Sequence, residues 1–286
     1  MTTAKAAEIM FGEKLYQIRA RKVLPILVRQ VEAQQTITYE DLANEVGMPN
    51  PRNLNFVLGS VGETLLYLSR KWNEKIPLIN SLVVNKQSRL PGEGIGWFIN
   101  SNEEYKRLPR REQKRITDKI LEDVYDYKKW DQVLLELGLQ PAPRQDLTAL
   151  RHIIASRGYG GGESQEHKEF KLFISRNPQK LDLPRSVGVG KTEECLPSGD
   201  VPDVFFEHGD DWIFVETKSR KSDKADIYRG LYQCKKYLAV GEAMQLEEGR
   251  PQSCRVVLVL ENAFPVDLIW LKNMFDVEVI ENIKIH

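Results

Sequence analysis

Apolar residues in the first half of the chain recur with the spacing of α-helices. Residues 6–34 carry them on one helical face, with Pro25 breaking or kinking the run. Thr38 has the side chain of a helix N-cap, and Gly47 ends the short helix that follows it. A second helix is expected from about Arg52, after a proline-rich turn. The first half therefore predicts a mainly helical domain.

A polar segment, residues 86–92, lies between two short apolar stretches at 76–84 and 95–99. Turn-forming residues between apolar runs are typical of a β-hairpin, so this region predicts a hairpin or the wing of a winged helix. A charged helix is expected at about 109–127, and a shorter one ends at Gly138.

In the second half, short apolar runs alternate with helical patterns. Strands are expected at residues 203–206, 212–217, 255–261 and 277–280, and helices at 164–175, 225–240 and 266–275. This alternation is typical of an α/β core. Because prolines and glycines punctuate the preceding segment, the sequence predicts a helical domain at 1–140, a linker at 141–162 and an α/β domain at 163–286.

Composition fits a protein with two cores and no membrane span. The chain has 286 residues, of which 41% are hydrophobic, but it lacks a long apolar run and an N-terminal apolar signal core. Its three cysteines are scattered without Cys-x-x-Cys spacing, and its four histidines do not complete a zinc pattern. These features indicate reduced thiols and predict a cytoplasmic location.

The formal net charge of zero counts mildly against nucleic-acid binding, although local basic patches matter more than the total. The first patch comprises Arg107, Arg110, Arg111, Lys114 and Arg115. The second comprises Lys218, Arg220, Lys221, Lys224, Arg229, Lys235 and Lys236. Each patch is either a binding surface or a solvated face, and for the first the two interpretations are about equally supported.

Candidate chemistry lies around a predicted β-hairpin with its turn at residues 207–211. Asp203 opens the first strand, and Glu216 and Lys218 lie two residues apart at the end of the second, very apolar strand. Because side chains alternate along a strand, Glu216 and Lys218 share one face. Burying both charges costs several kcal/mol, roughly, unless they are paired or bound to a metal.

This grouping suits metal-dependent phosphodiester hydrolysis, which needs a divalent cation to neutralise charge and activate water. Asp203 and Glu216 offer the carboxylate oxygens that Mg²⁺ prefers, and the backbone carbonyl of Thr217 offers a third ligand. Lys218 is suited to orient or help deprotonate the attacking water, or to stabilise the pentavalent phosphorane. The alternative is a surface hairpin in which the Glu-x-Lys sequence arose by chance.

The Pro-Asp sequence followed by Glu-x-Lys at the end of an apolar strand resembles the PD-(D/E)xK nuclease superfamily. The resemblance covers about residues 160–285 and falls on Asp203, Glu216 and Lys218. It implies a restriction-endonuclease-like α/β core, a mixed sheet flanked by helices, with Mg²⁺ or Mn²⁺ as cofactor. The element Gln233 to Tyr237 resembles the superfamily's Q-x-x-x-Y element, in which Gln233 is the expected participant; Tyr237 alternatively only packs.

The superfamily often places another glutamate on the first core helix, where Glu163, Glu166 and Glu169 are candidates. Glu166 is favoured because it projects near the middle of the apolar stripe that Phe170 and Phe173 define. It is therefore expected to approach the same metal as Asp203. The alternative is a carboxylate favoured in the first turn by the helix dipole.

Residues 36–100 resemble the winged-helix DNA-binding domain of alkylguanine-DNA alkyltransferases and their alkyltransferase-like relatives. The matching segments are 37–43, 51–58, 76–77 and 82–85. The resemblance implies docking in the minor groove with Arg52 as the base-probing side chain, and it makes Tyr39, Asn53 and Asn55 candidate DNA contacts.

This chain departs from the alkyltransferase pattern where chemistry would occur. The family's Pro-Cys-His-Arg motif is replaced by the stretch from Pro77 to Leu82, and residues 64–75 lengthen the region. Without a thiolate there is no alkyl acceptor, so the domain resembles a reader rather than a repair enzyme. A generic winged helix or a protein-interaction module remains the alternative.

The sequence thus predicts a Mg²⁺-dependent (or Mn²⁺-dependent) DNA endonuclease with an N-terminal domain that reads DNA. Double-stranded DNA is the expected substrate, and a role in restriction or phage defence would suit the architecture. The alternatives are a non-catalytic DNA-binding protein that uses the nuclease fold as a scaffold, or an RNA-processing nuclease. A homodimer is left open, and no membrane association is expected.

Overall fold

The computed structural model describes residues 7–92, 105, 107–157, 164–251 and 253–285. Contacts separate the chain into an N-terminal unit, Met1–Arg144, and a C-terminal unit, Gln145–His286. Each unit has its own hydrophobic core. Within the described ranges, every helix is too short or too polar to cross a membrane.

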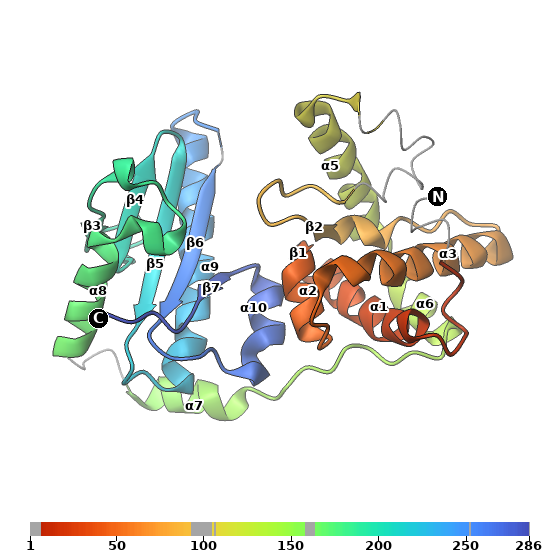
Figure 1. The fold of residues 1–286 in the computed structure, drawn as a ribbon, viewed down its shortest axis with the longest axis horizontal. Helices are drawn as coiled ribbons and strands as arrows, with labels where there is room; N and C mark the ends of the chain where they lie inside the picture. Colours follow the sequence, from red (N-terminus) through yellow and green to blue (C-terminus); the bar gives the residue numbers. More distant parts are fainter. Residues whose placement is uncertain (1–6, 93–104, 106, 158–163, 252, 286) are drawn as a thin grey trace. The chain divides into compact units, whose positions relative to one another are not determined.

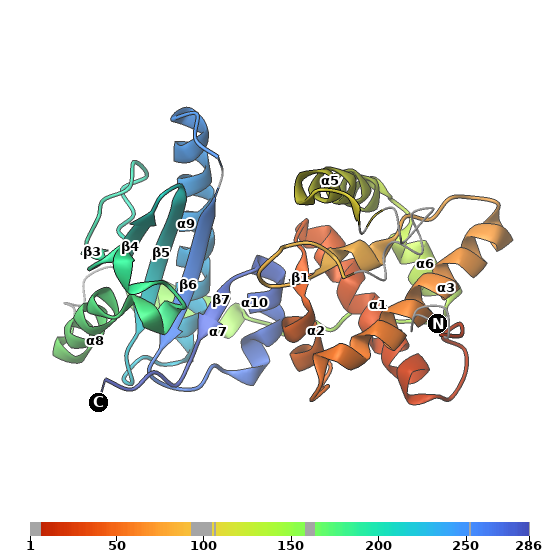
Figure 2. The same ribbon diagram turned by 45° about the horizontal axis from the view of Figure 1, so that its top comes forward.

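The N-terminal unit is mainly helical (Figures 1 and 2). Its elements are α1 Leu15–Ala33, β1 Ile37–Thr38, α2 Tyr39–Glu45, the 3-10 helix η2 Pro51–Asn53, α3 Leu54–Trp72, the 3-10 helix η3 Ile79–Leu82, β2 Val83–Val84, α5 Arg110–Asp126 and α6 Trp130–Glu136. Helices α1 and α3 pack against each other and supply most of the core.

Three expectations for this unit meet different outcomes. The predicted cap is confirmed, since the hydroxyl of Thr38 accepts a hydrogen bond from the Asp41 amide at 3.0 Å. Pro25 does not end the first helix, because α1 continues on both sides of it with the proline buried. The segment 64–75, expected to lengthen the alkyltransferase-like region, falls mostly in the second half of α3, which is one continuous helix.

The segment expected to be a hairpin or wing forms a tight turn after β2. The Asn85 amide donates to the Leu90 carbonyl and the Arg89 amide donates to the Asn85 carbonyl, both at 2.9 Å. Val84 and Pro91 then form an antiparallel bridge. β2 itself pairs in parallel with β1. The second apolar stretch of the expected hairpin, residues 95–99, lies outside the described residues.

The C-terminal unit is a mixed five-stranded sheet with helices on both faces (Figure 1). Its elements are α7 Thr148–Arg157, α8 Gln165–Arg176, the 3-10 helices η5 Pro178–Leu181 and η6 Arg185–Val187, β3 Lys191–Thr192, β4 Val204–His208, β5 Asp211–Lys218, α9 Lys224–Glu247, β6 Cys254–Leu260, η7 Val266–Leu268, α10 Ile269–Phe275 and β7 Glu278–Ile280. The strand order is β3-β4-β5-β6-β7, with β3 and β4 antiparallel to their neighbours and β5, β6 and β7 parallel.

The alternation of side chains along β5 divides the core into two layers. Ile213 and Val215 join Phe170 of α8 on one face, whereas Phe214 packs under α9 on the other. The predicted strands and the α9 helix are confirmed with ends shifted by a few residues, and the expected mixed α/β architecture is present.

The residues expected to form a linker instead contain α7, which packs on α9. Arg151 of α7 donates to the hydroxyl of Tyr228 at 3.1 Å, and Leu147 joins the core beneath α9. A helix forms here because the apolar residues of this short segment have a core to pack against, which local composition does not reveal.

The far end of α9 holds the β4–β5 hairpin at its tip. The buried side chain of Gln245 donates to the carbonyl of Asp210 at 2.8 Å and accepts from the amide of Ser253 at 2.7 Å. Gly209 takes a left-handed conformation in the two-residue turn, with φ of 64°. Helix α9 therefore fixes the hairpin turn as well as packing along the sheet.

Candidate functional site

The β4–β5 hairpin brings Asp203 next to the end of β5. The two strands pair in register from His208 and Asp211 back to Val204 and Val215. Asp203, one residue before β4, therefore lies opposite the segment that contains Glu216 and Thr217. The hairpin predicted from the turn residues thus joins two parts of the candidate site through local geometry alone.

Asp203 is a largely buried carboxylate with three hydrogen-bonding neighbours. Its Oδ2 accepts from the backbone amide of Thr217 at 2.7 Å and from the Thr217 hydroxyl at 2.8 Å. Its Oδ1 lies 3.4 Å from Nε2 of His167 on α8. Burial disfavours its ionised form, but His167, the charge of Lys218 and the Thr217 amide together hold the pKa of Asp203 below its ordinary value.

Glu216 and Lys218 form a buried ion pair under α9. Lys218 Nζ lies 2.6 Å from Glu216 Oε1, and the two side chains are only 11% and 4% exposed, for the lysine and the glutamate respectively. The hydroxyl of Tyr237 donates to Glu216 Oε2 at 3.0 Å. Gln233 accepts from Lys218 at 3.5 Å and donates to the Tyr237 hydroxyl at 3.4 Å.

These contacts make Tyr237 a stronger participant in the site than Gln233, the reverse of what was expected. Gln233 lies at the site, as expected, but its contacts are long. Tyr237, for which simple packing was the alternative, makes the shorter contact with Glu216 and is almost fully buried. Both residues project from the same face of α9 one turn apart, which is why they reach the same pair.

Burial and mutual attraction set the charges of this pair. Burial raises the pKa of Glu216, the nearby charge of Asp203 raises it further, and Lys218 only partly opposes this. Burial would lower the pKa of Lys218, but the carboxylates of Glu216 and Asp203 raise it above its ordinary value. The carboxylates of Glu216 and Asp203 therefore favour the ammonium form of Lys218.

Gly230 lets α9 approach this pair closely. A Cβ atom at Gly230 would lie 2.9 Å from Lys218 Cε and 2.9 Å from Leu258 Cδ1. Any larger residue would have to displace the lysine or part the helix from the sheet. The absence of a side chain at this position is thus part of how the lysine is placed.

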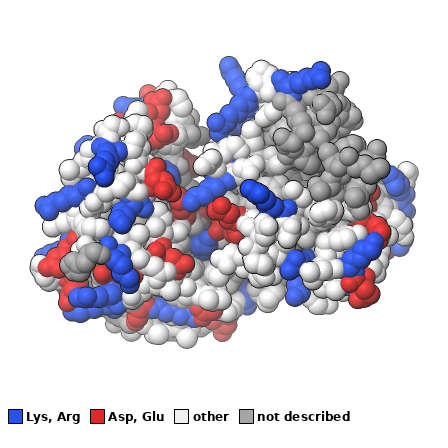
Figure 3. All heavy atoms as spheres, viewed as in Figure 1, with Lys and Arg blue, Asp and Glu red and all other residues white. Residues whose placement is uncertain are grey.

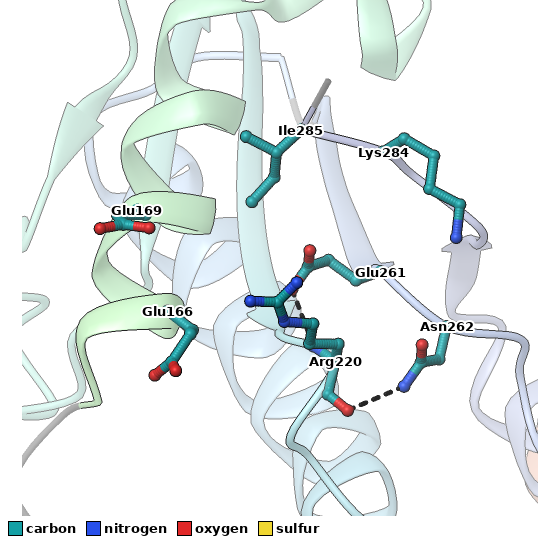
Figure 4. A pocket seen from close by; sticks show the side chains of 7 residues that line it. All are labelled: Glu166, Glu169, Arg220, Glu261, Asn262, Lys284 and Ile285. Carbon is teal, nitrogen blue, oxygen red and sulfur yellow. Dashed lines mark hydrogen bonds between the residues drawn. The ribbon is translucent and has the colours of Figure 1, made fainter.

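Glu166, which was expected to accompany the Asp203 carboxylate, has a lysine as its ion-pair partner, and its approach to Asp203 stays a prediction. It forms an ion pair with Lys221, which lowers its pKa. It also lines a cavity of about 310 Å³ with Glu169, Arg220, Glu261, Asn262, Lys284 and Ile285. Figure 4 shows Glu166 and Glu169 reaching from α8, with Arg220 between them and Glu261.

The helix residue that contacts Asp203 is His167, which the sequence interpretation did not consider. His167, Phe170 and Ile174 have the spacing of one helical face, and the last two are buried. Glu166 is the preceding residue of the helix and, like His167, is half-buried. The positions of Phe170 and Ile174 in the sequence already place His167 on the buried face of the helix.

The second basic patch predicted from the sequence is largely neutralised. Lys218 pairs with Glu216, Lys221 with Glu166, Lys224 with Asp267 and Lys236 with Asp200. These lysines therefore belong to separate ion pairs rather than to one basic surface.

In the N-terminal unit, Arg52, Asn53 and Asn55 are exposed where η2 leads into α3. The Asn50 side chain caps this start by accepting from the Arg52 amide at 3.0 Å. Tyr39 has a different environment, because its hydroxyl accepts from the Gly92 amide at 3.1 Å and its ring is half-buried. Tyr39 fastens the turn after β2, while Arg52, Asn53 and Asn55 present polar groups outward.

The donor set suits a hard divalent cation only in part. Among the residues described, no three His, Cys, Asp or Glu side chains are gathered to hold a metal ion. Mg²⁺, however, is usually held by one or two carboxylates, with waters and substrate phosphate completing its shell. Asp203 and Glu216 offer two carboxylates of this kind. The carbonyl of Thr217 as a third ligand stays a prediction.

Comparison of the chain with protein-family models, with curated proteins and with solved structures gave no match. The functional argument therefore depends on the residues of the site and on their geometry.

Proposed function

We propose that the protein is a divalent-metal-dependent DNA endonuclease whose catalytic centre is formed by Asp203, Glu216 and Lys218. The observation that carries this proposal is the buried Glu216–Lys218 pair beside Asp203. Burying two carboxylates and an ammonium ion costs free energy. A function is therefore the expected reason why the chain contains them. Their order along the chain also resembles that of the PD-(D/E)xK nucleases.

Each residue has a task that its contacts suit. Asp203 and Glu216 would hold the cation, Mg²⁺ or Mn²⁺, through the carboxylate oxygens that face the end of β5. When bound, the cation would supply charge neutralisation at the phosphate and a lowered pKa for the attacking water. Lys218, kept protonated by Glu216, would donate a hydrogen bond to a phosphate oxygen or to the attacking water rather than remove a proton.

Residues around these three would keep the geometry fixed. Tyr237 and Gln233 hold Glu216 and Lys218 from α9, and the Thr217 amide holds Asp203. His167 is placed to orient Asp203 or to join it at the cation. Such supporting contacts matter because small displacements of catalytic groups slow a reaction strongly.

DNA is the proposed substrate because of the N-terminal unit. Arg52, Asn53 and Asn55 lie exposed at the start of α3. By the sequence resemblance to the alkyltransferase-like domains, α3 would be the recognition helix. Arginine and asparagine side chains are suited to contact base edges, and a helix start adds amide donors for phosphate.

The test is incubation of the purified full-length chain with supercoiled plasmid, with Mg²⁺, with Mn²⁺ and with EDTA. We expect nicking or linearisation only when metal is present, and none with Asp203→Ala. Glu207→Ala is the matched control, because Glu207 lies on the same hairpin in an exposed ion pair with Arg250. It should cut at the wild-type rate.

Three outcomes would count against the proposal. Cleavage by Asp203→Ala at the wild-type rate would remove this residue from catalysis. Binding of DNA without cleavage by the wild type in either metal would favour the non-catalytic scaffold. Cleavage of structured RNA but not of DNA would favour an RNA-processing nuclease.

A further inference from the structure

The first two turns of α5 in the N-terminal unit carry a concentration of basic side chains. The residues concerned are Arg110, Arg111, Lys114 and Arg115, and all four are exposed. Arg107 is exposed just before the helix begins. Figure 3 shows Lys and Arg side chains over α5 at the top of the view. The opposite face of the helix is held in the unit by the buried residues Thr117 and Val124.

The order of charges along α5 is the reverse of the order that stabilises a helix. Cations are unfavourable near a helix N-terminus and acids are unfavourable near its C-terminus. In α5 the four basic residues of the first two turns accompany one acid, Glu112, whereas the second half contains Asp118, Glu122, Asp123 and Asp126 with one cation, Lys119. Three exposed ion pairs, Lys114 with Asp118 at 2.9 Å, Arg115 with Glu112 at 3.0 Å and Lys119 with Glu122 at 3.3 Å, offset this only slightly. A charge distribution that is unfavourable at both ends of one helix indicates that the basic end has a function.

The basic end of α5 is joined to the turn after β2. Arg110 donates to the carbonyl of Ser88 in that turn at 3.2 Å. Arg89 of the same turn donates to the hydroxyl of Thr36 at 2.7 Å, which ties the turn to the start of β1. Lys86 and Arg89 are both exposed. Turn and helix together form one continuous surface, here called the basic edge, made of Lys86, Arg89, Arg110, Arg111, Lys114 and Arg115.

We propose that the basic edge binds the sugar-phosphate backbone of DNA, separately from the base-facing residues at the start of α3. This inference rests on the proposed DNA-directed function and adds the contact that would supply sequence-independent affinity. Arg110 with Lys114, and Arg111 with Arg115, form two rows, each spanning one helical turn. Parallel rows of cations suit a polymer of evenly spaced phosphates better than a single small anion. Arginine also pairs with phosphate through two hydrogen bonds.

The test compares binding of a short fluorescent DNA duplex at several salt concentrations, with EDTA present so that metal-dependent cleavage does not occur. One variant carries Arg110→Gln, Arg111→Gln, Lys114→Gln and Arg115→Gln. The matched control carries four equally exposed changes elsewhere in the same unit, Arg70→Gln, Lys71→Gln, Lys75→Gln and Lys128→Gln. Both variants have the same net charge, so the comparison isolates position.

We expect the slope of log affinity against log salt to become shallower by about 3.6 in the basic-edge variant, since each of the four lost phosphate contacts removes about 0.9 from it. Its affinity at low salt should fall by at least about tenfold. The control should keep a slope close to that of the wild type. The basic-edge variant should unfold at the same temperature as the wild type or higher, because cations leave a helix N-terminus.

The outcomes separate this inference from the proposed nuclease. An unchanged slope in the basic-edge variant, while the wild type binds DNA, overturns the inference and leaves the nuclease proposal intact; an acidic protein would then be the better partner. Equal losses in both variants overturn it as well. A reduced slope together with no cleavage by the wild type in either Mg²⁺ or Mn²⁺ supports the inference and overturns the nuclease. Absence of any DNA binding by the wild type overturns both.

Discussion

The charged residues proposed to be functional in the two units occupy opposite environments. In the C-terminal unit, Glu216 and Lys218 are buried together under α9 and are held by hydrogen bonds. In the N-terminal unit, Arg52 and the arginines of α5 face solvent and make few contacts that stabilise the fold. The difference determines how substitutions should be interpreted. A change in the buried set alters stability and chemistry together, whereas a change in the exposed set reports on binding with little effect on folding.

The largest expected effect comes from breaking the buried pair. Lys218→Met should destabilise the protein by about 3–5 kcal/mol, because it leaves Glu216 buried without its partner. The double variant Glu216→Gln with Lys218→Met should recover most of that loss. Lys71→Met, which breaks an exposed pair with Glu136, should cost less than about 1 kcal/mol. Urea denaturation measures all three, and similar losses for the two single variants would contradict the contrast between the units.

The same variant has an expected pH dependence. Glu216 has a raised pKa in the folded protein, so the folded state binds its proton more readily than the unfolded state does. The stability contributed by this group therefore rises as pH falls through the raised pKa toward the unfolded one. Lys218→Met removes a charge that lowers the pKa of Glu216, so the variant should gain stability relative to the wild type as pH falls from neutral toward about 4.3, the ordinary pKa of glutamate. A stability difference that is constant over this range would contradict the assignment.

The next effect concerns the placement of the lysine rather than its charge. Gly230→Ala would introduce a Cβ atom against Lys218 Cε and Leu258. Cleavage should slow by about 10–100-fold, because displaced catalytic groups lose much of their effect. DNA affinity should stay at the wild-type value, since α9 belongs to the other unit. Equal cleavage rates for the variant and the wild type would show that the lysine moves aside without consequence.

A smaller effect is expected on the exposed side of the comparison. Arg52→Ala should weaken DNA binding by about 1–3 kcal/mol if the contact is to a base, and Arg52→Lys should restore only part of it. Metal-dependent stabilisation of the protein should not change. Titration of duplex DNA at two salt concentrations measures this, and equal affinities for wild type and Arg52→Ala at both would remove the base-reading role.

The smallest effect tests whether His167 or Glu166 of α8 supports the proposed metal site. His167→Ala should raise the Mg²⁺ concentration needed for half-maximal cleavage by about tenfold, because the support of a metal ligand is lost. Glu166→Gln, which breaks only the pair with Lys221, should change it less than about twofold on the scale of an exposed ion pair. The reverse order of effects would return the metal-associated role to Glu166.

Much of the candidate site could be predicted because it depends on short-range geometry. Asp203, Glu216 and Lys218 are brought together by strand alternation and by one tight hairpin, and both are visible in the sequence. The pattern of apolar residues likewise gave the strands of the sheet and the long helix α9. These features follow from local backbone periodicity, which a single sequence contains.

What could not be predicted depends on contacts between distant segments. His167 meets Asp203 because of how α8 packs on the sheet through Phe170 and Ile174. Tyr39 turned out to hold the amide of Gly92, a residue far along the chain. The helix α7 appeared in the expected linker because it has α9 to pack on.

Helix α9 contacts both ends of the β4–β5 hairpin, and these contacts limit which sequence changes the protein can accept. Tyr237 donates to Glu216 from the middle of the helix, and Gln245 donates to the carbonyl of Asp210 at the hairpin tip. A single-residue insertion or deletion within β5 would move Glu216 and Lys218 to the α8 face, away from these contacts with α9. The separation of Tyr237 and Gln245 along α9 thus fixes the length of β5. Variants of this chain that keep the chemistry are free to vary in loop sequence, but not in the length of this strand.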